Sequence, residues 1–389
     1  MRATQPTCFD VAVVGAGPAG CSAALALAQA GRAVLLLEKA VLPRYKTCGG
    51  GVLARAFKLL PPNLESVIEC SFHSVALNFL GENMSFIATR PQPMVYMTMR
   101  ADLDCLLART AQKAGVQLIE GCQVKQVQVH ADGVEIVSDR ESYRAKFIVA
   151  ADGVHSTTAK ATGWPDLPFL APALEYELYP AAGNDFARFG QRPRFDFNTI
   201  DAGYAWVFPK RGHLSVGILS THRICPDLRT KLAEYVHQLG LEQAGRVERH
   251  GYLIPLAPRC GSLARGRVLL VGDAAGLVDP ITAEGISHAI LSGQLAATAL
   301  AEGRLEVDPV GRIYQSLLEK HILGELRAAR FLARLLYGHR LIRHGAFRWQ
   351  GQKFCDFITR VIMGESSYRE SLKQPSSYFK LLGWKGISQ

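Results

Sequence analysis

A glycine pattern near residue 15 constrains this chain more than any other feature. Gly15, Gly17 and Gly20 have the spacing Gly-x-Gly-x-x-Gly. Gly15 and Gly17 lie between apolar segments at 9–14 and 19–30, and Gly20 lies at the start of the second segment. The first segment is typical of a fully buried parallel strand, and the second of a helix packed on it. The glycines permit a tight turn, a close approach of the backbone to a pyrophosphate, and close helix–strand packing. Because the helix N-terminus offers free N–H groups to phosphates, the pattern predicts a dinucleotide site.

An acidic residue follows at the end of the next predicted strand. Residues 34–37 form a short apolar run, and Glu38 and Lys39 come directly after it. A carboxylate at that strand tip can accept hydrogen bonds from both hydroxyls of a ribose. Strand, glycines, helix, strand and acid therefore occur in the order that a Rossmann-type nucleotide domain requires.

Two further signatures place an acid and a glycine at the end of an apolar run. Asp152-Gly153 ends one run, and Gly272-Asp273 ends another. We expect the Asp273 carboxylate to accept from the hydroxyls of a ribityl chain. The segment 280–286 then brings a helix N-terminus to a flavin ring, where its positive end stabilises the anionic reduced form. Together the three signatures predict a site for flavin adenine dinucleotide (FAD).

The order of predicted strands and helices indicates interleaved domains. The 389 residues suit two or three modules, and no apolar run reaches the ~18–20 residues that a membrane-spanning helix needs. We predict an α/β fold with a Rossmann-type FAD-binding domain, an antiparallel-sheet substrate domain and C-terminal helices. The predicted bounds are 1–70, 99–162 and 255–305 for the FAD-binding domain, 71–98 and 163–254 for the substrate domain, and 306–389 for the helical region, with a loosely held tail at 375–389.

The formal net charge of +10 indicates anionic ligands, a solvated basic surface, or both. FAD, a pyridine nucleotide, a pyrophosphate ester or an anionic membrane surface would each fit, whereas no basic–aromatic motif for nucleic acid is present. Nine scattered cysteines without metal-ligand spacing favour a reducing cytoplasm and predict neither disulfides nor a metal site. Arginines are concentrated between Arg327 and Arg360, in helices that either contact the inner face of a membrane or pack on the protein with their arginines solvated.

A cysteine–glycine motif follows the acidic residue of the nucleotide domain. In the segment 43–51, Cys48 and Gly49 are followed by two more glycines, ending at Gly51. The three glycines let the backbone lie against a flat ring, and the cysteine supplies a small polarizable group beside it.

An aromatic motif falls on a predicted strand in the second half of the chain. Tyr204, Trp206 and Phe208 alternate with small or aliphatic residues, so they point to one face and form a continuous aromatic wall. The segment 209–213 is expected to turn the chain. A strand at 214–219, which contains Gly217, then pairs back.

With these signatures the sequence resembles the single-Rossmann flavoproteins of the para-hydroxybenzoate hydroxylase-like superfamily, over residues 9–300. The resemblance implies that FAD binds at the positions that match the superfamily's pattern. The candidate cofactor-binding residues are Gly15, Gly17, Ala19, Gly20, Glu38, Lys39, Cys48, Gly49, Gly51, Arg100, Val124, Asp152, Gly153, Asp273, Gly285 and Ile286.

The cysteine–glycine and aromatic motifs together resemble the geranylgeranyl reductase family. This resemblance implies reduction of isolated double bonds in the prenyl chains of chlorophyll, archaeal lipids or quinones. Few residues precede the first strand, so we expect no plastid leader. The candidate catalytic residues are Cys48, Tyr204 and Trp206, and the candidate substrate-binding residues are Tyr204, Trp206, Phe208 and Gly217.

An isolated alkene is not electrophilic, so we hypothesise that protonation leads and that a hydride from reduced flavin captures the tertiary cation. The aromatic wall would stabilise that cation by a cation–π attraction of ~2 kcal/mol, and Cys48 either shapes the site or relays a proton. No second Gly-x-Gly-x-x-Gly follows a strand. The electron donor is therefore either NADPH that binds transiently or a small acidic protein, a reduced ferredoxin or flavodoxin.

Two other functional classes fit the same signatures. A flavin monooxygenase or a halogenase acting on a hydrophobic or aromatic substrate uses a related scaffold, because fold alone does not fix the chemistry. The segment 204–209 resembles, without matching, the Trp-x-Trp-x-Ile-Pro pattern expected of halogenases. A flavin-bearing binding or sensing protein is the third alternative.

Overall fold

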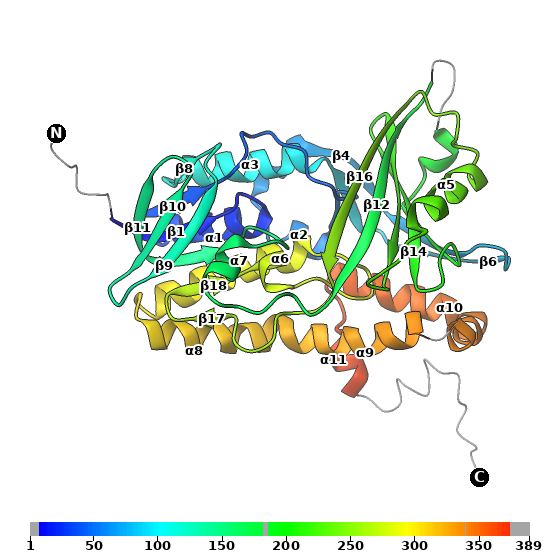
Figure 1. Ribbon diagram of the computed structural model, residues 1–389. Helices are drawn as coiled ribbons and strands as arrows, with labels where there is room; N and C mark the ends of the chain where they lie inside the picture. The colour runs from blue at the N-terminus through cyan, green and yellow to red at the C-terminus, as the bar shows by residue number, and fades with distance from the viewer. Residues whose placement is uncertain (1–7, 182–185, 339, 374–389) are drawn as a thin grey trace, which may run out of the picture.

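A mostly parallel, eight-stranded sheet begins at residue 8 in the computed structural model, which describes residues 8–181, 186–338 and 340–373 (Figure 1). Its strands are β1 (Cys8–Val14), β2 (Val34–Leu37), β8 (Gln117–Ile119), β9 (Val124–Val129), β10 (Val134–Ser138), β11 (Ser142–Ala150), β17 (Ala264–Arg265) and β18 (Val268–Leu270). The parallel strands have the order β18–β11–β1–β2–β8, and β9, β10 and β17 are attached antiparallel. β2 is buried along its whole length, which is why it reads as a continuous apolar run.

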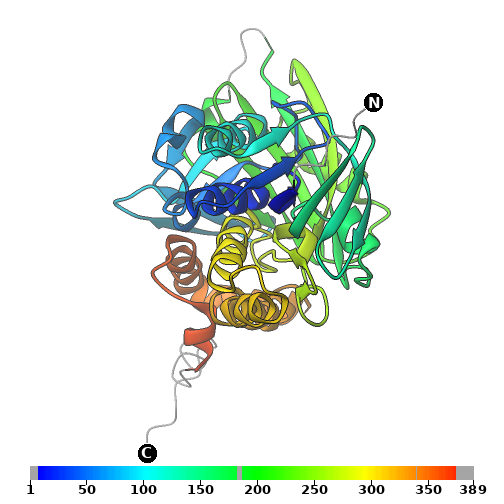
Figure 2. The same ribbon diagram turned by 90° about the vertical axis from the view of Figure 1, so that its left-hand side faces the viewer.

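Helices pack on this sheet and on one another. α1 (Pro18–Gln29) contacts α3 (Arg100–Lys113) and α7 (Ile286–Glu302), and α7 also contacts α8 (Val307–Leu318), as Figures 1 and 2 show. α1 and α7 approach so closely that a β-carbon on Gly293 would lie 2.2 Å from the carbonyl oxygen of Ala19. The shorter helices of this half are α2 (Ala54–Phe57), α4 (Thr157–Ala161) and α6 (Gly272–Ala275).

A second, seven-stranded sheet stands at the other end of the molecule (Figure 1). Its strands, in spatial order, are β16 (Arg246–Pro255), β12 (Leu170–Tyr179), β15 (His213–Ser220), β14 (Gly203–Lys210), β13 (Arg194–Phe197), β5 (Ser74–Phe79) and β6 (Met84–Thr89). The sheet combines two separate stretches of the chain, which confirms the predicted interleaving of the fold. Neighbours pair antiparallel, as predicted, except β13 and β5, which run parallel where the two stretches meet.

Two local expectations for this region need correction. Residues 163–254 were expected to be strand-like, but α5 (Leu228–Gln238) covers the outer face of the sheet through Leu232 and Tyr235 (Figure 1). The turn expected at 209–213 is shorter, because Pro209 and Lys210 remain paired with β15 and only Arg211 and Gly212 connect the strands.

A small three-stranded sheet links the two halves. It contains β3 (Gly51–Leu53), β7 (Val95–Thr98) and β4 (Ile68–Phe72), with β7 in the middle, and a 3₁₀ helix (Pro62–Val67) precedes β4. β4 crosses the predicted limit between residues 70 and 71, whereas β7 ends at the predicted limit at residue 98. The domain bounds remain a prediction.

The C-terminal helices lie along one side of both halves, at the bottom of Figure 1. They comprise α8, a π-helical turn (Glu319–Leu323), α9 (Gly324–Gly338), α10 (Arg340–Met363) and α11 (Tyr368–Lys373), and α10 is bent at Gln350. Phe347 of α10 packs among Phe79, Phe86 and Phe197 of the second sheet. The predicted helical region is thereby confirmed, while the tail predicted at 375–389 lies outside the described residues.

Candidate active site

One cavity of about 710 Å³ extends from the carboxyl ends of β1 and β2 to α9 and α10. It lies at the strand ends where doubly wound sheets bind ligands, and its volume is within the range of small-molecule sites. All predicted site residues line this cavity except Gly20 and Gly217. Those that line it are Gly15, Gly17, Ala19, Glu38, Lys39, Cys48, Gly49, Gly51, Arg100, Val124, Asp152, Gly153, Tyr204, Trp206, Phe208, Asp273, Gly285 and Ile286.

The glycines of the first signature shape one end of the cavity. Gly15 has φ +102°, and a β-carbon there would lie 2.4 Å from the carbonyl oxygen of Ala151. At Gly17 a β-carbon would meet only the Arg100 guanidinium, at 3.8 Å, so the backbone faces open space. The first helical hydrogen bond of α1 joins Cys21 N to Gly17 O, so the earlier N–H groups have no acceptor within the helix. Such a cradle fits a diphosphate.

Gly20 serves packing rather than the cavity, so its predicted contact with the cofactor is not supported. A β-carbon at Gly20 would lie 1.9 Å from the carbonyl oxygen of Gly15. The third glycine of the motif therefore lets the helix begin directly above the turn.

Glu38 is held in place at the same end of the cavity. Its side chain is buried, with Oε2 accepting from Ala16 N at 2.8 Å and Oε1 accepting from Arg44 Nε at 3.3 Å. Arg44 also donates to buried Asp104 at 2.8 Å, and Asp104 accepts two hydrogen bonds from Arg100. Burial lowers the pKa of Arg44, but Asp104 and Glu38 outweigh that effect and raise it. The arrangement presents two fixed guanidinium groups beside a carboxylate, which suits a diphosphate and a ribose.

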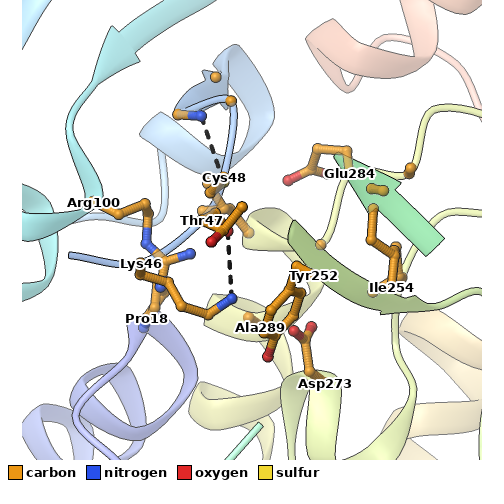
Figure 3. Close-up of a pocket in the computed structure, with 18 of the residues that line it drawn as sticks. Pro18, Lys46, Thr47, Cys48, Arg100, Tyr252, Ile254, Asp273, Glu284 and Ala289 are labelled. Carbon is orange, nitrogen blue, oxygen red and sulfur yellow. Dashed lines mark hydrogen bonds between the residues drawn. The ribbon is translucent and has the colours of Figure 1, made fainter. Parts of the chain in front are cut away.

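Lys46, which the sequence analysis left without a role, extends across the cavity. Figure 3 shows its side chain running from Arg100 toward Tyr252 and Asp273. Its Nζ lies 3.1 Å from the centroid of the Tyr252 ring. Burial, and next the positive charge of Arg100, lower the pKa of Lys46 to about 8. An anionic group bound in the cavity would therefore stabilise the charged form of Lys46 and raise its pKa.

The segment before α7 is anchored from three sides. Asp279 accepts from Ile281 N at 2.8 Å and from the Tyr368 hydroxyl at 3.0 Å. The Tyr337 hydroxyl donates to Ile281 O at 2.5 Å, and the Tyr204 hydroxyl donates to Thr282 O at 2.6 Å. The segment 279–285 is thus fixed, and it holds the N-terminus of α7 at the cavity wall, as a flavin ring would need.

Asp152 has a structural task as well as its place at the cavity. Its carboxylate accepts from the hydroxyl of Ser156 and from Thr158 N, which fixes the start of α4. The adjacent Gly153 has φ +79° and faces the Tyr252 hydroxyl.

The aromatic wall lies on the inner face of the second sheet. Tyr204, Trp206 and Phe208 line the cavity, while the alternating residues Ala205 and Val207 belong to the outer core against α5. The wall is packed against the cysteine–glycine segment. A β-carbon on Gly49 would lie 2.7 Å from the Phe208 ring, and Cys48 Sγ accepts from Gly50 N at 3.4 Å.

Gly217 was predicted to contact substrate, but it lies behind the wall. It pairs in register with Trp206, and a β-carbon there would lie 2.0 Å from the indole. The missing side chain allows the indole to lie flat on β15. Trp206 Nε1 then donates to Ser215 Oγ at 3.3 Å.

Two buried glutamates complete the site and were missed by the sequence analysis. Glu175 and Glu177 alternate with outward-facing residues on β12, and both point to the inner face with almost no exposure. Glu175 lines the cavity and accepts from Ser215 Oγ at 2.5 Å. The sequence contained a signal for these two residues. Glu175 and Glu177 share the strand face of Ala171 and Ala173, and two acids on an otherwise apolar face are unusual.

The fold and the site define a flavin-dependent oxidoreductase. The sequence pattern of the family described as FAD binding domain matches residues 8–170, and that of the family described as FAD dependent oxidoreductase matches residues 98–301. The buried carboxylate, the two arginines and the glycine cradle at one end of the cavity fit FAD. We conclude that FAD is the cofactor.

Comparison with known proteins identifies the family within the FAD-dependent oxidoreductases. The chain is 31% identical to digeranylgeranylglycerophospholipid reductase 1 of Methanopyrus kandleri, over 84% of this chain and 90% of that one. It is 30% identical to menaquinone reductase of Mycobacterium tuberculosis, over 84% of each chain. The crystal structure of a geranylgeranyl bacteriochlorophyll reductase-like protein from Thermoplasma acidophilum superposes with a TM-score of 0.79 at 23% identity, covering 97% and 96% of the two chains. The chain belongs to the geranylgeranyl reductase family of FAD-dependent oxidoreductases.

A flavin-dependent brominase also shares this fold, with a TM-score of 0.71 at 19% identity over 92% of this chain and 94% of that one. At that identity the likeness concerns the fold alone. The two relatives reported above, at 31% and 30% identity, are named as reductases.

Proposed function

We propose that this protein saturates isolated double bonds of a prenyl chain. The observation that supports this most directly is the continuity of the cavity. From the residues that fit FAD it passes the aromatic wall and enters an apolar section. That section is lined by Val75, Leu77, Met97, Phe195, Phe197, Leu219, Ile254, Leu336, Phe354, Ile358 and Ile362. A methyl-branched prenyl chain fits such a section, whereas a polar substrate would lose its hydration there.

Bound and reduced FAD supplies a hydride, and the residues of the chain supply the rest. Arg44, Arg100 and the start of α1 hold the diphosphate, and Glu38 orients the ribose. The aromatic wall excludes water and faces the alkene, where it stabilises positive charge on a tertiary carbon by ~2 kcal/mol or more. The Tyr204 hydroxyl and the Trp206 N–H are both engaged with protein acceptors, so these rings act through their faces.

We infer that reducing equivalents come from NADPH that binds transiently or from a small acidic electron-transfer protein. The net charge of +10 supports either anionic donor. Stopped-flow reduction by NADPH alone separates the two. Fast bleaching of the flavin supports the nucleotide, and negligible bleaching supports a protein donor.

We further propose that α9 and α10 contact an anionic bilayer. Phe331 and Trp349 are 47% and 74% exposed, and Arg330, Arg334, Arg348 and Lys353 are exposed around them. α10 also lines the apolar end of the cavity, so a membrane-borne chain would enter nearby. Among the helices that the structure describes, none is both long and apolar enough to cross a membrane. Flotation with anionic but not neutral liposomes supports surface binding, and no flotation in either case contradicts it.

The deciding experiment uses dithionite-reduced protein under argon. It is incubated with geranylgeranyl diphosphate, and the product mass is measured. We expect a gain of H₂ for each saturated bond, and none in the presence of oxidised protein. An unchanged prenyl mass would contradict the proposal, as would a hydroxylated or halogenated product in a parallel incubation with oxygen.

A further inference from the structure

Glu175 is a buried carboxyl group beside the aromatic wall. Its side chain is 1% exposed on the inner face of β12 and lines the cavity between Cys48 and Trp206. Oε1 accepts from Ser215 Oγ at 2.5 Å, and the backbone N–H of Cys48 points to the carboxyl group and opposes the rise of its pKa. Oε2 has no partner with full hydrogen-bond geometry among the described residues. A buried carboxyl oxygen without a partner is costly unless the group is neutral or has a ligand.

The neighbouring glutamate has the opposite environment. Glu177 lies 3.4 Å from Lys210 Nζ, which balances its negative charge, and 3.2 Å from His213 Nε2. Glu175 makes no ion pair within the part of the chain that the structure describes. Burial, and next the negative charge of Glu177, raise the pKa of Glu175 to about 7. The two carboxyl groups therefore divide into one that is ionised and one that retains its proton.

Ser215 ties this carboxyl group to the aromatic wall. Its hydroxyl donates to Glu175 and accepts from Trp206 Nε1 at 3.3 Å, and Gly217 separates Glu175 from Trp206 across the sheet. The carboxyl group consequently stands at the edge of the indole, on the face of the sheet that lines the cavity.

We propose that Glu175 is the catalytic acid that protonates the alkene, with Oε2 as the donor atom. This inference rests on the proposed reductase function. The π bond breaks and its two carbons gain one hydrogen each, a proton from Glu175 and a hydride from reduced FAD, which is oxidised by two electrons. The carboxylate that remains regains its proton from solvent before the next turnover.

The groups around Glu175 provide for that return of the proton. The titratable side chains that face it or the neighbouring Glu177 include Glu69 of β4, Lys210 of β14, His213 of β15, Glu248 and His250 of β16, and Tyr45 and Cys48 of the segment before β3. Tyr45 is 39% exposed and stacks on His250 with ring centroids 4.0 Å apart, so this cluster reaches the surface.

The first test measures the carboxyl group itself, in the protein without reduced cofactor. Difference infrared spectra between pH 5 and 9 detect the carbonyl stretch of a protonated carboxylic acid. We expect wild type to keep such a band to near neutral pH and Glu175→Gln to lack it. Glu248→Gln, on the neighbouring strand and partly exposed, is the matched control and should keep the band. A spectrum that Glu175→Gln leaves unchanged overturns the proposal.

The second test measures single-turnover reduction of a prenyl alkene across the same pH range. We expect wild type to slow as pH rises through about 7, and Glu175→Gln to be slower by about 100-fold or more with that pH dependence lost. Glu175→Asp should restore the pH dependence in part. If Glu175→Gln matches wild type in rate and pH profile, Glu175 is not the acid, although the reductase function stands. If wild type reduces no alkene, the proposed function fails, and the proton donor role fails with it whatever the infrared band shows.

Discussion

The indole of Trp206 lies flat on the backbone of Gly217, in the space that a β-carbon would occupy 2.0 Å from the ring. The two residues are paired in register on β14 and β15. This contact sets the tilt of the ring and allows its N–H to reach Ser215. The glycine of the aromatic motif is therefore explained by packing within the sheet and not by contact with a ligand.

Replacing Gly217 with alanine should displace this ring. We expect Gly217→Ala to lose about 1–3 kcal/mol of unfolding free energy, as overpacked cores do, and to lower turnover strongly. Urea unfolding and single-turnover rates measure both. Gly345→Ala is the control, because among the described residues no atom outside the backbone of its own helix lies within 4 Å of a β-carbon there. Wild-type behaviour of Gly217→Ala would show that the ring position does not matter.

Two substitutions in the aromatic wall should distinguish the effect of losing a ring on turnover from the effect of losing a hydroxyl group. Trp206→Ala removes a ring face and should slow turnover about tenfold to thirtyfold beyond any loss of FAD. Tyr204→Phe keeps the ring and removes only the hydrogen bond to Thr282, which costs about 1 kcal/mol of stability. Its turnover should stay within a few-fold of wild type. Equal losses in the two variants would contradict an action through the ring faces.

Glu38 should control FAD affinity. Glu38→Gln weakens the charge-assisted contacts to Arg44 and to the ribose, each worth about 1.5–3 kcal/mol, so the Kd for FAD should rise roughly 10- to 100-fold. Fluorescence quenching of FAD measures the Kd. Glu120→Gln, which disturbs only a partly exposed pair with Arg109, should bind FAD like wild type. An unchanged Kd for Glu38→Gln would remove this carboxylate from the cofactor site.

The raised pKa of Glu175 has a consequence for stability that does not depend on turnover. The folded protein holds this proton up to about pH 7, whereas an unfolded glutamate releases it near 4.5. The stabilisation is therefore complete below pH 4.5 and is lost as pH rises through 7. Relative to Glu175→Gln, wild type should lose on the order of 3 kcal/mol across that interval. Parallel pH profiles of urea unfolding for the two proteins would contradict this.

Lys46 should make FAD binding depend on pH in the alkaline range. Its pKa of about 8 means that it is mostly neutral above that pH in the absence of the cofactor. Binding of an anion would raise this pKa, so FAD affinity should fall by up to about tenfold per pH unit above 8. Lys46→Met should flatten the dependence. Lys58→Met, whose ammonium group donates to Met363 O away from the cavity, should retain it.

The nucleotide end of the site could be predicted because its residues are close together in the sequence. Gly15, Gly17 and Glu38 lie within 24 consecutive residues of one strand–helix–strand unit, and spacing alone fixes their relative positions. The aromatic wall was predictable for the same reason, since strand alternation decides which of its side chains share a face.

The missed features depend on which strands become neighbours. Glu175 meets Ser215 across 40 positions of sequence, and the parallel pairing of β13 with β5 joins segments more than 100 residues apart. No local pattern encodes such a register. The error at α5 is different, because Leu228, Leu232 and Val236 recur at four-residue intervals, a helical period that the sequence carries.

The hydroxyls of Tyr337 and Tyr368 reach back to the segment 279–282, more than 50 positions earlier in the chain. A nascent polypeptide consequently cannot finish shaping that segment until translation has passed codon 368. Premature termination before Tyr337 should therefore yield a molecule whose Rossmann strands form but whose segment 279–282 lacks both of these hydrogen bonds.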